Sequence, residues 1–193
     1  MPSLGWNASQ SLDGLPVRAW RGFVWRIHGV DLSASRLAGA PVFYDPTSHG
    51  GSRKRSGRYH RARDLFPTGR VWPALYTALT DGGCIAEGIR HAGSLKDLYT
   101  LRITRLQVEL SAVFDLTDPS AYGLTLADVI DDFDYALTQE LGLAALLRGV
   151  EGILVPPASR VGTNLVILTE NLAPTSRIVA LDSIDPRLYV PRT

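Results

Sequence analysis

The chain concentrates positive charge in one short stretch, residues 50–63, which reads GGSRKRSGRYHRAR. The stretch holds six basic side chains and no acidic one, whereas the whole chain has a formal net charge of +1. The basic residues are Arg53, Lys54, Arg55, Arg58, Arg61 and Arg63. Such a cluster indicates an anionic, phosphate-bearing partner. That partner is either a nucleic-acid backbone or a small nucleotide, and the charge pattern is compatible with both.

A carboxylate follows on a predicted helix, residues 80–93, which begins with capping residues and ends at a glycine. Ile85 and Ile89 form the apolar stripe of this helix. Glu87 lies about 200° from Ile85, because each helical residue turns the chain by about 100°. Its side chain should therefore point away from the stripe, near His91. The alternative is an ordinary solvated helix glutamate.

The sequence does not contain the residue patterns of several other kinds of active site. No two histidines are four apart on a helix and there is one cysteine, so we expect no catalytic zinc site. Serine-hydrolase, Walker-type and dinucleotide-binding glycine motifs are also missing from the sequence. Taken singly, Cys84 is expected to be a small core residue, Tyr76 a core or edge tyrosine and Ser159 a turn residue.

Composition predicts one globular domain. The chain has 193 residues, of which 45% are hydrophobic and 20% charged. We expect neither a signal peptide nor a membrane span, since the N-terminus has no apolar run and no stretch approaches about 18 apolar residues. A single cysteine cannot form an internal disulfide, which fits a cytoplasmic protein. Near-neutral charge argues against a dedicated DNA-binding domain.

Local patterns predict a compact α+β domain with short mixed β-sheets and a few helices. The expected strands are residues 21–29, 72–79, 98–103, 112–119, 151–157, 163–168 and 177–181. Besides helix 80–93, residues 125–149 should form two helices, or one interrupted at Gly142. Residues 33–70 should form a long polar loop, which is often functional. Residues 1–20 are expected to be an irregular N-terminal extension to a catalytic domain at 21–193.

An ordered set of motifs resembles the RES domain family. The motifs are SGRYHRA, LYTAL, AEGIRH, VFDLTDP and GVEGILVPPASRVGTNLVIL, and the similarity covers about residues 21–170. The family is named after an Arg, a Glu and a Ser. Its members are toxins of bacterial toxin–antitoxin pairs that attack NAD, with a fold similar to ADP-ribosyltransferases. The resemblance therefore implies an ADP-ribosyltransferase-like fold.

The resemblance also implies which residues form the site. The family Arg falls on Arg58, its Tyr on Tyr76, its Glu on Glu87 and its Ser on Ser159, just before the Asn-Leu-Val strand that starts at Asn164. Arg58, Tyr76 and Glu87 would be catalytic, and NAD would be bound by Arg58, Tyr76, Ser159 and Asn164. Arg58 would hold the pyrophosphate, Tyr76 would face the nicotinamide, and Ser159 would hydrogen-bond the amide or a ribose hydroxyl.

Two features depart from the family pattern. Eighteen residues separate Arg58 from Tyr76, whereas many members have a shorter gap, and the extra residues 62–69 (ARDLFPTG) would enlarge the pocket mouth. The family serine usually follows a proline directly, but here Ala158 stands between Pro157 and Ser159.

The expected function is degradation of NAD, as substrate and without a metal, by a toxin-like glycohydrolase or phosphorylase. A DNA-binding antitoxin is the expected partner, with no direct nucleic-acid or membrane binding, and a homodimer is an open alternative. Competing hypotheses are an ADP-ribosyltransferase that modifies a protein, a nucleic-acid-binding protein that uses residues 50–63 as a clamp, and an inactive RES domain that only binds NAD or a partner.

Overall fold

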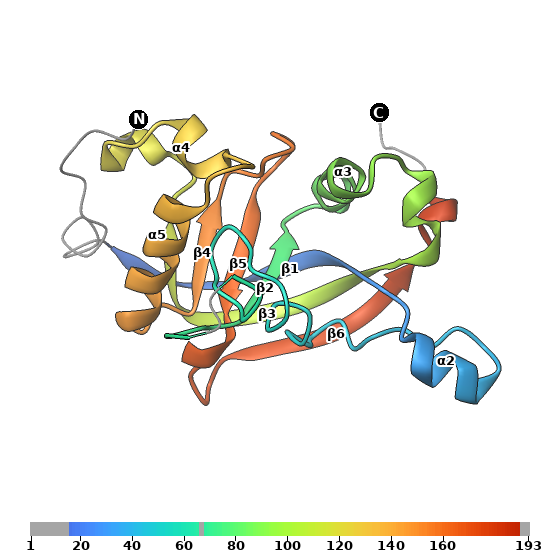
Figure 1. The fold of residues 1–193 in the computed structure, drawn as a ribbon. Coiled ribbons are helices and arrows are strands. Elements are labelled where there is room, and N and C mark those ends of the chain that lie inside the picture. Colours follow the sequence, from blue (N-terminus) through green and yellow to red (C-terminus); the bar gives the residue numbers. More distant parts are fainter. Residues whose placement is uncertain (1–15, 66–67, 190–193) are drawn as a thin grey trace.

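The computed structural model describes residues 16–65 and 68–189 and contains one mixed six-stranded sheet (Figure 1). The strands are β1 (Val17–His28), β2 (Ala74–Ala78), β3 (Arg102–Asp115), β4 (Gly152–Val155), β5 (Asn164–Leu168) and β6 (Arg177–Ile184). Their order is β1-β2-β5-β4-β3-β6, and β1 also pairs with β3, which closes the first five strands into a ring. Only β3 and β4 are paired in parallel.

Helices pack against two separate parts of the sheet, and one short helix, α2, lies apart from it (Figure 1). They are α2 (Leu32–Ala38), α3 (Asp81–Ala92), α4 (Leu126–Ile130) and α5 (Ala136–Leu147), with short 3-10 helices at Lys96–Thr100, Pro119–Tyr122, Thr169–Asn171 and Pro186–Leu188. In Figure 1, α5 lies beside β4 and β5, whereas α3 follows the end of β2. The α+β class expected from the sequence is therefore confirmed.

Helix α3 forms where its capping residues predict it. The Thr80 side chain accepts a hydrogen bond from the Gly83 N–H, which satisfies one of the free donors of the first turn. Gly93 ends the helix with φ of 100°, a conformation that glycine adopts without steric cost. The predicted helix 80–93 is thus correct to within its caps.

The longest strand, β3, was predicted as two separate strands. Residues 98–103 were expected to be extended, but Lys96–Thr100 is a 3-10 helix that buries Leu98. Leu98 and Leu101 are three residues apart, which fits one 3-10 turn rather than a strand, and the Leu101 N–H donates to the Leu98 carbonyl at 2.9 Å. Residues 112–115 of the predicted strand 112–119 are the last part of β3, which ends at Asp115, and the remaining residues are not in a strand.

Other boundaries also differ from the sequence predictions. β1 begins at Val17, four residues before the predicted strand 21–29, and residues 1–15 of the expected N-terminal extension lie outside the described residues. The predicted loop 33–70 contains most of helix α2, Leu32–Ala38. Asp31 accepts a hydrogen bond from the Ala34 N–H at 3.0 Å, which supports the first turn of this short helix.

Helix α5 runs without interruption through Gly142, so the predicted break at this residue is wrong. The chain leaves helical geometry at residues 131–135 instead, between α4 and α5. A Cβ atom at Gly142 would lie 2.2 Å from the Tyr59 carbonyl oxygen. The glycine therefore serves close packing: it lets the helix touch the backbone of the long loop.

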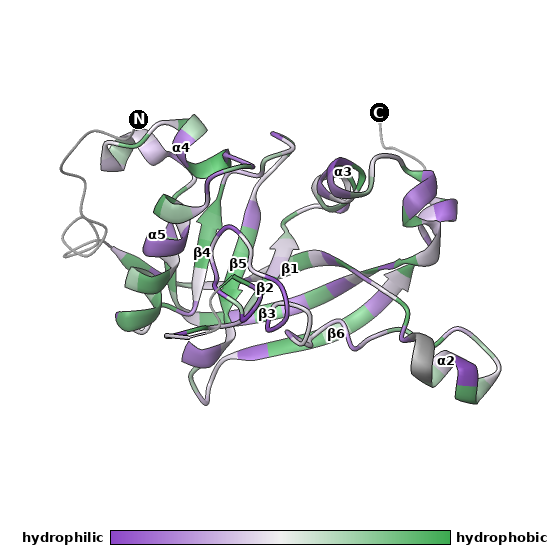
Figure 2. Ribbon diagram, in the orientation of Figure 1, coloured by the Kyte–Doolittle hydropathy of each residue, from purple (hydrophilic) through white to green (hydrophobic). Residues whose placement is uncertain are grey.

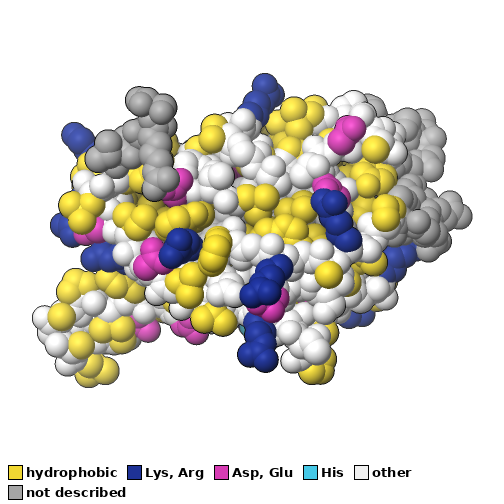
Figure 3. Space-filling model, turned by 180° about the vertical axis from the view of Figure 1, so that it is seen from behind, with side chains coloured by type: hydrophobic (Ala, Val, Ile, Leu, Met, Phe, Trp, Pro, Cys, Tyr) yellow, Lys and Arg dark blue, Asp and Glu magenta, His cyan; other side chains and the backbone are white. Residues whose placement is uncertain are grey.

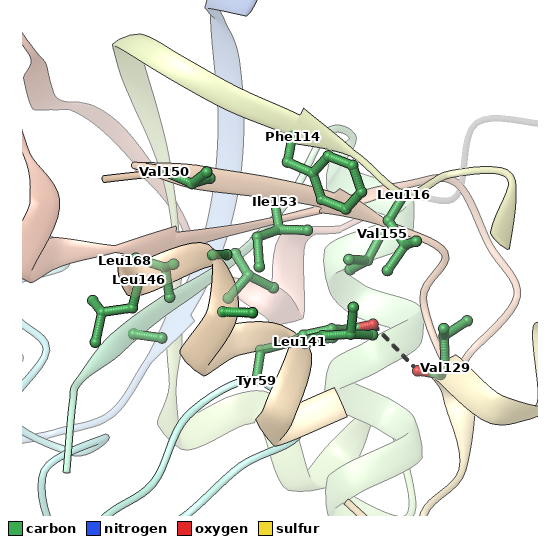
Figure 4. Packing of buried hydrophobic residues seen from close by; sticks show 14 of the residues in the cluster. Tyr59, Phe114, Leu116, Val129, Leu141, Leu146, Val150, Ile153, Val155 and Leu168 are labelled. Atoms are coloured by element: carbon green, nitrogen blue, oxygen red, sulfur yellow. Dashed lines mark hydrogen bonds between the residues drawn. The ribbon is translucent and has the colours of Figure 1, made fainter. Parts of the chain in front are cut away.

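The main core cluster lies between α5, β4, β5 and the end of β3. Figure 2 shows that β4, β5 and α5 are hydrophobic, whereas α3 carries more hydrophilic residues. Tyr59 inserts into this cluster beside Leu141, and its hydroxyl donates to the Val129 carbonyl at 3.4 Å (Figure 4). The long basic loop is thus tied to the core by one aromatic side chain.

The opposite face of the molecule is less uniform. Figure 3 shows hydrophobic side chains in the middle of this face, with basic and acidic side chains next to one another around them. Phe23 and Val179 are about half exposed on β1 and β6. The Arg105 guanidinium lies 5.1 Å from the Phe23 ring centroid and pairs with Asp182, so part of this apolar surface is covered by a charged side chain.

None of the helices in the described part of the chain combines the length and the apolar character needed to cross a membrane.

We predict that Gly142→Ala destabilises the protein. Alanine normally stabilises a helix interior by up to about 1 kcal/mol over glycine, but here the new methyl group would overlap the Tyr59 backbone, which cannot rotate away. Overpacking of this kind costs about 1–3 kcal/mol. Denaturant unfolding would measure the change. Gly82→Ala is the control, because its Cβ would meet only the Tyr189 hydroxyl at 3.4 Å. Equal stability of Gly142→Ala and wild type would contradict the packing argument.

Candidate active site

A cavity of about 580 Å³ opens between β2, α3 and the long loop. It is lined by Arg58, Tyr76, Glu87 and Asn164, four of the five site residues expected from the sequence. They come from the loop, β2, α3 and β5 respectively. Ser159 is not among the lining residues, but its backbone reaches Glu87.

Glu87 is the carboxylate of this cavity. Its side chain is 16% exposed, and Oε1 accepts a hydrogen bond from the Ser159 N–H at 2.5 Å. Oε2 lies 3.7 Å from Nε2 of His91, one turn along α3. Glu87 therefore points toward His91, as the helix periodicity predicts. It is not a solvated surface glutamate, because a turn of the opposite chain segment holds one of its oxygens.

Ser159 contributes its backbone to this contact. It lies in the turn after β4, where the Arg160 N–H donates to the Pro157 carbonyl at 3.0 Å. The Ser159 hydroxyl accepts a hydrogen bond from the Val161 N–H at 3.4 Å, within the same turn. The expected contact of this hydroxyl with a substrate stays a prediction. The contact with Glu87 uses the Ser159 backbone N–H, so it does not need a particular side chain at this position.

Tyr76 is held by its hydroxyl group. The Tyr59 N–H donates to this oxygen at 2.8 Å, and His60 Nδ1 lies 2.9 Å away. A Cβ at Gly57 would lie 2.6 Å from the His60 ring and 3.0 Å from the Tyr76 oxygen. The glycine of the GRYH motif therefore makes room for this network. Burial raises the pKa of Tyr76, so its hydroxyl stays protonated and can donate.

The proton positions of His60 follow from its partners. Nε2 lies 2.8 Å from the Arg55 carbonyl oxygen, which can only accept, so Nε2 carries the proton. Burial lowers the pKa of His60, which favours the neutral ring. Nδ1 then accepts a hydrogen bond from the Tyr76 hydroxyl. His60 was not predicted from the sequence, because a lone histidine in a basic loop resembles a solvated one.

Arg58 is turned toward the segment between α4 and α5. Its Nε donates to the Asp131 carbonyl at 3.1 Å, and Nη2 contacts the Ile130 carbonyl at 3.3 Å and Oδ1 of Asp132 at 3.0 Å. The side chain is 11% exposed, and its guanidinium lies 5.4 Å from the centroid of the Tyr135 ring. Tyr135 also lines the cavity and was missed by the sequence analysis.

Asn164 lines the cavity and carries a buried acceptor. Its Oδ1 is buried, and no described residue donates a hydrogen bond to it. Buried polar atoms are rarely left without a partner, because desolvation then goes uncompensated. The amide is thus suited to receive an N–H group from a bound molecule.

Cys84 lines the same cavity but is a poor nucleophile. It is buried, and desolvation raises the pKa of its thiol to about 12. The interpretation as a small core residue is consistent with its packing in a cluster with Ile85 and Leu98. Within residues 16–65 and 68–189, no group of three or more His, Cys, Asp and Glu side chains is arranged to hold a metal ion.

The basic stretch does not form one exposed surface. Arg55 and Arg58 line the cavity, whereas the guanidinium of Arg61 lies 5.7 Å from the Trp72 ring centroid. Nη1 of Arg63 donates to the Gly69 carbonyl at 3.2 Å. Arg26 of β1 adds a further cation to the cavity lining. Burial lowers the pKa of Arg26 to about 10, which leaves it charged at neutral pH.

We predict that stability falls as the pH is lowered through the histidine range. The pKa of His60 in the folded state is below its unfolded value of about 6.5. At pH values between these two pKa values, the unfolded state therefore binds more protons than the folded state. Stability is therefore complete above about pH 6.5 and is lost below it, by at most about 1.4 kcal/mol per pH unit for one proton. His28 and His49 also have lowered pKa values and add to the wild-type slope.

The test is denaturant unfolding of wild type and His60→Gln between about pH 7.5 and pH 5. The variant should be less stable at neutral pH, because Tyr76 and Arg55 lose a partner, and its pH slope should be shallower. An unchanged slope would mean that His60 titrates as it does in the unfolded chain.

Comparison with known proteins identifies the family of this chain. The RES domain family model matches residues 23–189. The NAD(+) phosphorylases MbcT of Mycobacterium bovis and Mycobacterium tuberculosis are each 29% identical over 161 residues, covering 75% of this chain and 79% of theirs. The crystal structure of the M. tuberculosis MbcT–MbcA toxin–antitoxin complex matches with a TM-score of 0.72 and 25% identity, over 94% of this chain and 93% of that one. The chain belongs to the RES domain family.

Proposed function

We propose that this protein cleaves the nicotinamide–ribose bond of NAD. The observation that carries the proposal is the Glu87 carboxylate, fixed in one cavity with Arg58, Tyr76 and Asn164. The relatives named NAD(+) phosphorylase favour inorganic phosphate as the acceptor. Water would give the hydrolytic reaction instead, and a protein acceptor would give ADP-ribosylation.

Cleavage of this bond needs a negatively charged group beside the ribose rather than a proton donor for the leaving group. The nicotinamide ring is positively charged while it is attached to ribose, and it leaves as a neutral molecule. No proton therefore has to be supplied to it. The ribose carbon develops positive charge in an oxocarbenium-like transition state, as in glycoside cleavage. A negative charge held beside that carbon stabilises the transition state. Glu87 can supply it, and the Ser159 N–H keeps the carboxylate in position.

Asn164 and Tyr76 suit the nicotinamide end of the substrate. The free Oδ1 of Asn164 can accept an N–H of the nicotinamide carboxamide. The Tyr76 hydroxyl is already occupied by the Tyr59 N–H and by His60, so the ring is held in one orientation. A fixed aromatic face can pack against the flat nicotinamide ring.

A protein antitoxin is the partner that the comparison favours, since the M. tuberculosis relative is found in a complex with MbcA. We extend that partnership to this chain as part of the proposal. A DNA-binding character of the antitoxin, a homodimer, a cytoplasmic location and the likeness to ADP-ribosyltransferases stay predictions.

The decisive experiment is incubation of the purified protein with NAD, with and without phosphate. Phosphorolysis yields nicotinamide and ADP-ribose 1″-phosphate, whereas hydrolysis yields ADP-ribose. Glu87→Gln keeps size and hydrogen bonding but removes the charge, so we expect kcat to fall by about 10²–10³ while NAD binding changes little.

Glu140→Gln is the matched control, because Glu140 is an exposed glutamate on α5. Titration of NAD binding beside steady-state turnover separates the two effects. Turnover of Glu87→Gln within about threefold of wild type would remove Glu87 from catalysis, because one preorganised charge contributes far more than that.

Arg58→Lys should not behave as a conservative change. Lysine keeps the positive charge but loses the planar fork of N–H donors that matches a phosphate. We expect KM for NAD to rise about tenfold, as for the loss of one charge-assisted hydrogen bond. Arg53→Lys, at an exposed position of the same stretch, is the control. Unchanged kinetics in Arg58→Lys would mean that Arg58 does not bind the pyrophosphate.

A further inference from the structure

One carboxylate in the segment between α4 and α5 joins two arginines from different parts of the chain. Oδ1 of Asp132 lies 3.0 Å from Nη2 of Arg58, and Oδ2 pairs with Nη2 of Arg90 on α3. Arg58 is nearly buried, with 11% of its side chain exposed, whereas the Asp132 and Arg90 side chains are partly open to solvent at 33% and 29%. The two guanidinium groups therefore converge on one anionic group.

This arrangement has the chemistry of a phosphate site. Two oxygens of one anion each receive a charged N–H donor, and arginine is the side chain that presents such donors to phosphate as well as to carboxylate. Arg90 is one helical turn from Glu87, so both residues lie on neighbouring positions of the same helix surface. Arg58 lines the cavity itself. The pair thus lies beside the carboxylate proposed to act on ribose.

The segment that carries Asp132 is not held by apolar packing of its tip. Residues 131–135 contain three aspartates, and Phe133 is fully exposed. The Asp131 carboxylate accepts hydrogen bonds from the N–H groups of Phe133 and Asp134, so the turn is held from within. Ion pairs of Asp132 with Arg58 and Arg90 therefore link the segment to the cavity lining and to α3, and an incoming anion can take the place of this carboxylate. The hydrogen bonds of Arg58 to the Asp131 and Ile130 carbonyls hold its guanidinium in place beside the exchanged group.

We propose that Arg58 and Arg90 form one oxyanion-binding pair for a phosphate group of the reactants, and that Asp132 fills this pair when no reactant is bound. The inference rests on the proposed function and adds Arg90 as a substrate-binding residue and Asp132 as an internal competitor. The phosphate comes from one of two sources, the pyrophosphate of NAD or the inorganic phosphate acceptor. Either one binds more weakly than it would to a vacant pair, because it must displace the carboxylate.

Calorimetric titration of the full chain with ADP and, separately, with inorganic phosphate tests the pair without turnover. Arg90→Gln should weaken one of these ligands about tenfold, as for the loss of a charge-assisted contact. Asp132→Asn should strengthen the same ligand about threefold or more, because the competing charge is gone. A change for ADP assigns the pair to the pyrophosphate, and a change for inorganic phosphate assigns it to the acceptor.

Two controls match the lost charges: Lys54→Gln in the basic stretch and Asp134→Asn in the same segment as Asp132. Both should bind as wild type. Wild-type affinity of Arg90→Gln for both ligands overturns the proposal. Unchanged or weaker binding by Asp132→Asn overturns it too, since Asp132 would then only position Arg58. If the titrations behave as expected but NAD is not consumed, the oxyanion pair stands and the proposed reaction fails.

Discussion

The placement of the site loop depends on the burial of one side chain, Tyr59. The Gly57 N–H and carbonyl pair with those of His60, so Tyr59 stands at the tip of a tight turn. Its ring is inside the main core cluster, and its carbonyl lies against α5 at Gly142. With the tip fixed in the core, Arg58 is directed toward the α4–α5 segment and His60 toward β2. Burial of this one aromatic side chain thus anchors the loop in the core, and hydrogen bonds with Tyr76 of β2 and Arg26 of β1 hold it on the strand side.

The charges of the cavity are satisfied by separate partners. Glu87 is held by the Ser159 N–H and faces His91, whereas Arg58 pairs with Asp132. A direct pair between Glu87 and Arg58 would lower the field of each charge at the place where a substrate binds. The Ser159 N–H fixes the Glu87 carboxylate in advance, and a group preorganised in this way needs no rearrangement when charge develops on a substrate. Arg58 differs, because its ion pair with Asp132 has to open before an anion can take that place.

Local sequence signals predicted the local structure well. Helix α3 follows from Thr80 and Gly93, because capping acts within one turn of the chain. The same reasoning wrongly predicted a helix break at Gly142. This glycine is required for a contact with Tyr59, more than eighty residues earlier, and no local sequence pattern shows such a contact. The division of β3 failed for a related reason: its pairing with both β1 and β6 keeps it extended through a stretch where apolar spacing is ambiguous.

The same difference between local and long-range contacts decides which site residues could be predicted. The ordered motifs predicted Arg58, Tyr76, Glu87 and Asn164, and these four residues line one cavity, although their roles stay predictions. The groups that hold them were not predicted, because each is chosen by a contact across the fold. Asp132 illustrates this: in the sequence it is one of several aspartates in a polar segment, and only the fold brings it to Arg58.

The positions of the basic side chains in residues 50–63 help to decide between a nucleic-acid clamp and a nucleotide site. A clamp gains affinity from many exposed cations that each neutralise a phosphate of the backbone. Here Arg58 is almost buried against Asp132, and Arg61 packs over Trp72. Arg53, Lys54, Arg55 and Arg63 are exposed, but Arg55 also lines the cavity together with Arg58. Cations that converge on a small volume favour an anion with few phosphates, and a dinucleotide with its single pyrophosphate is of that size.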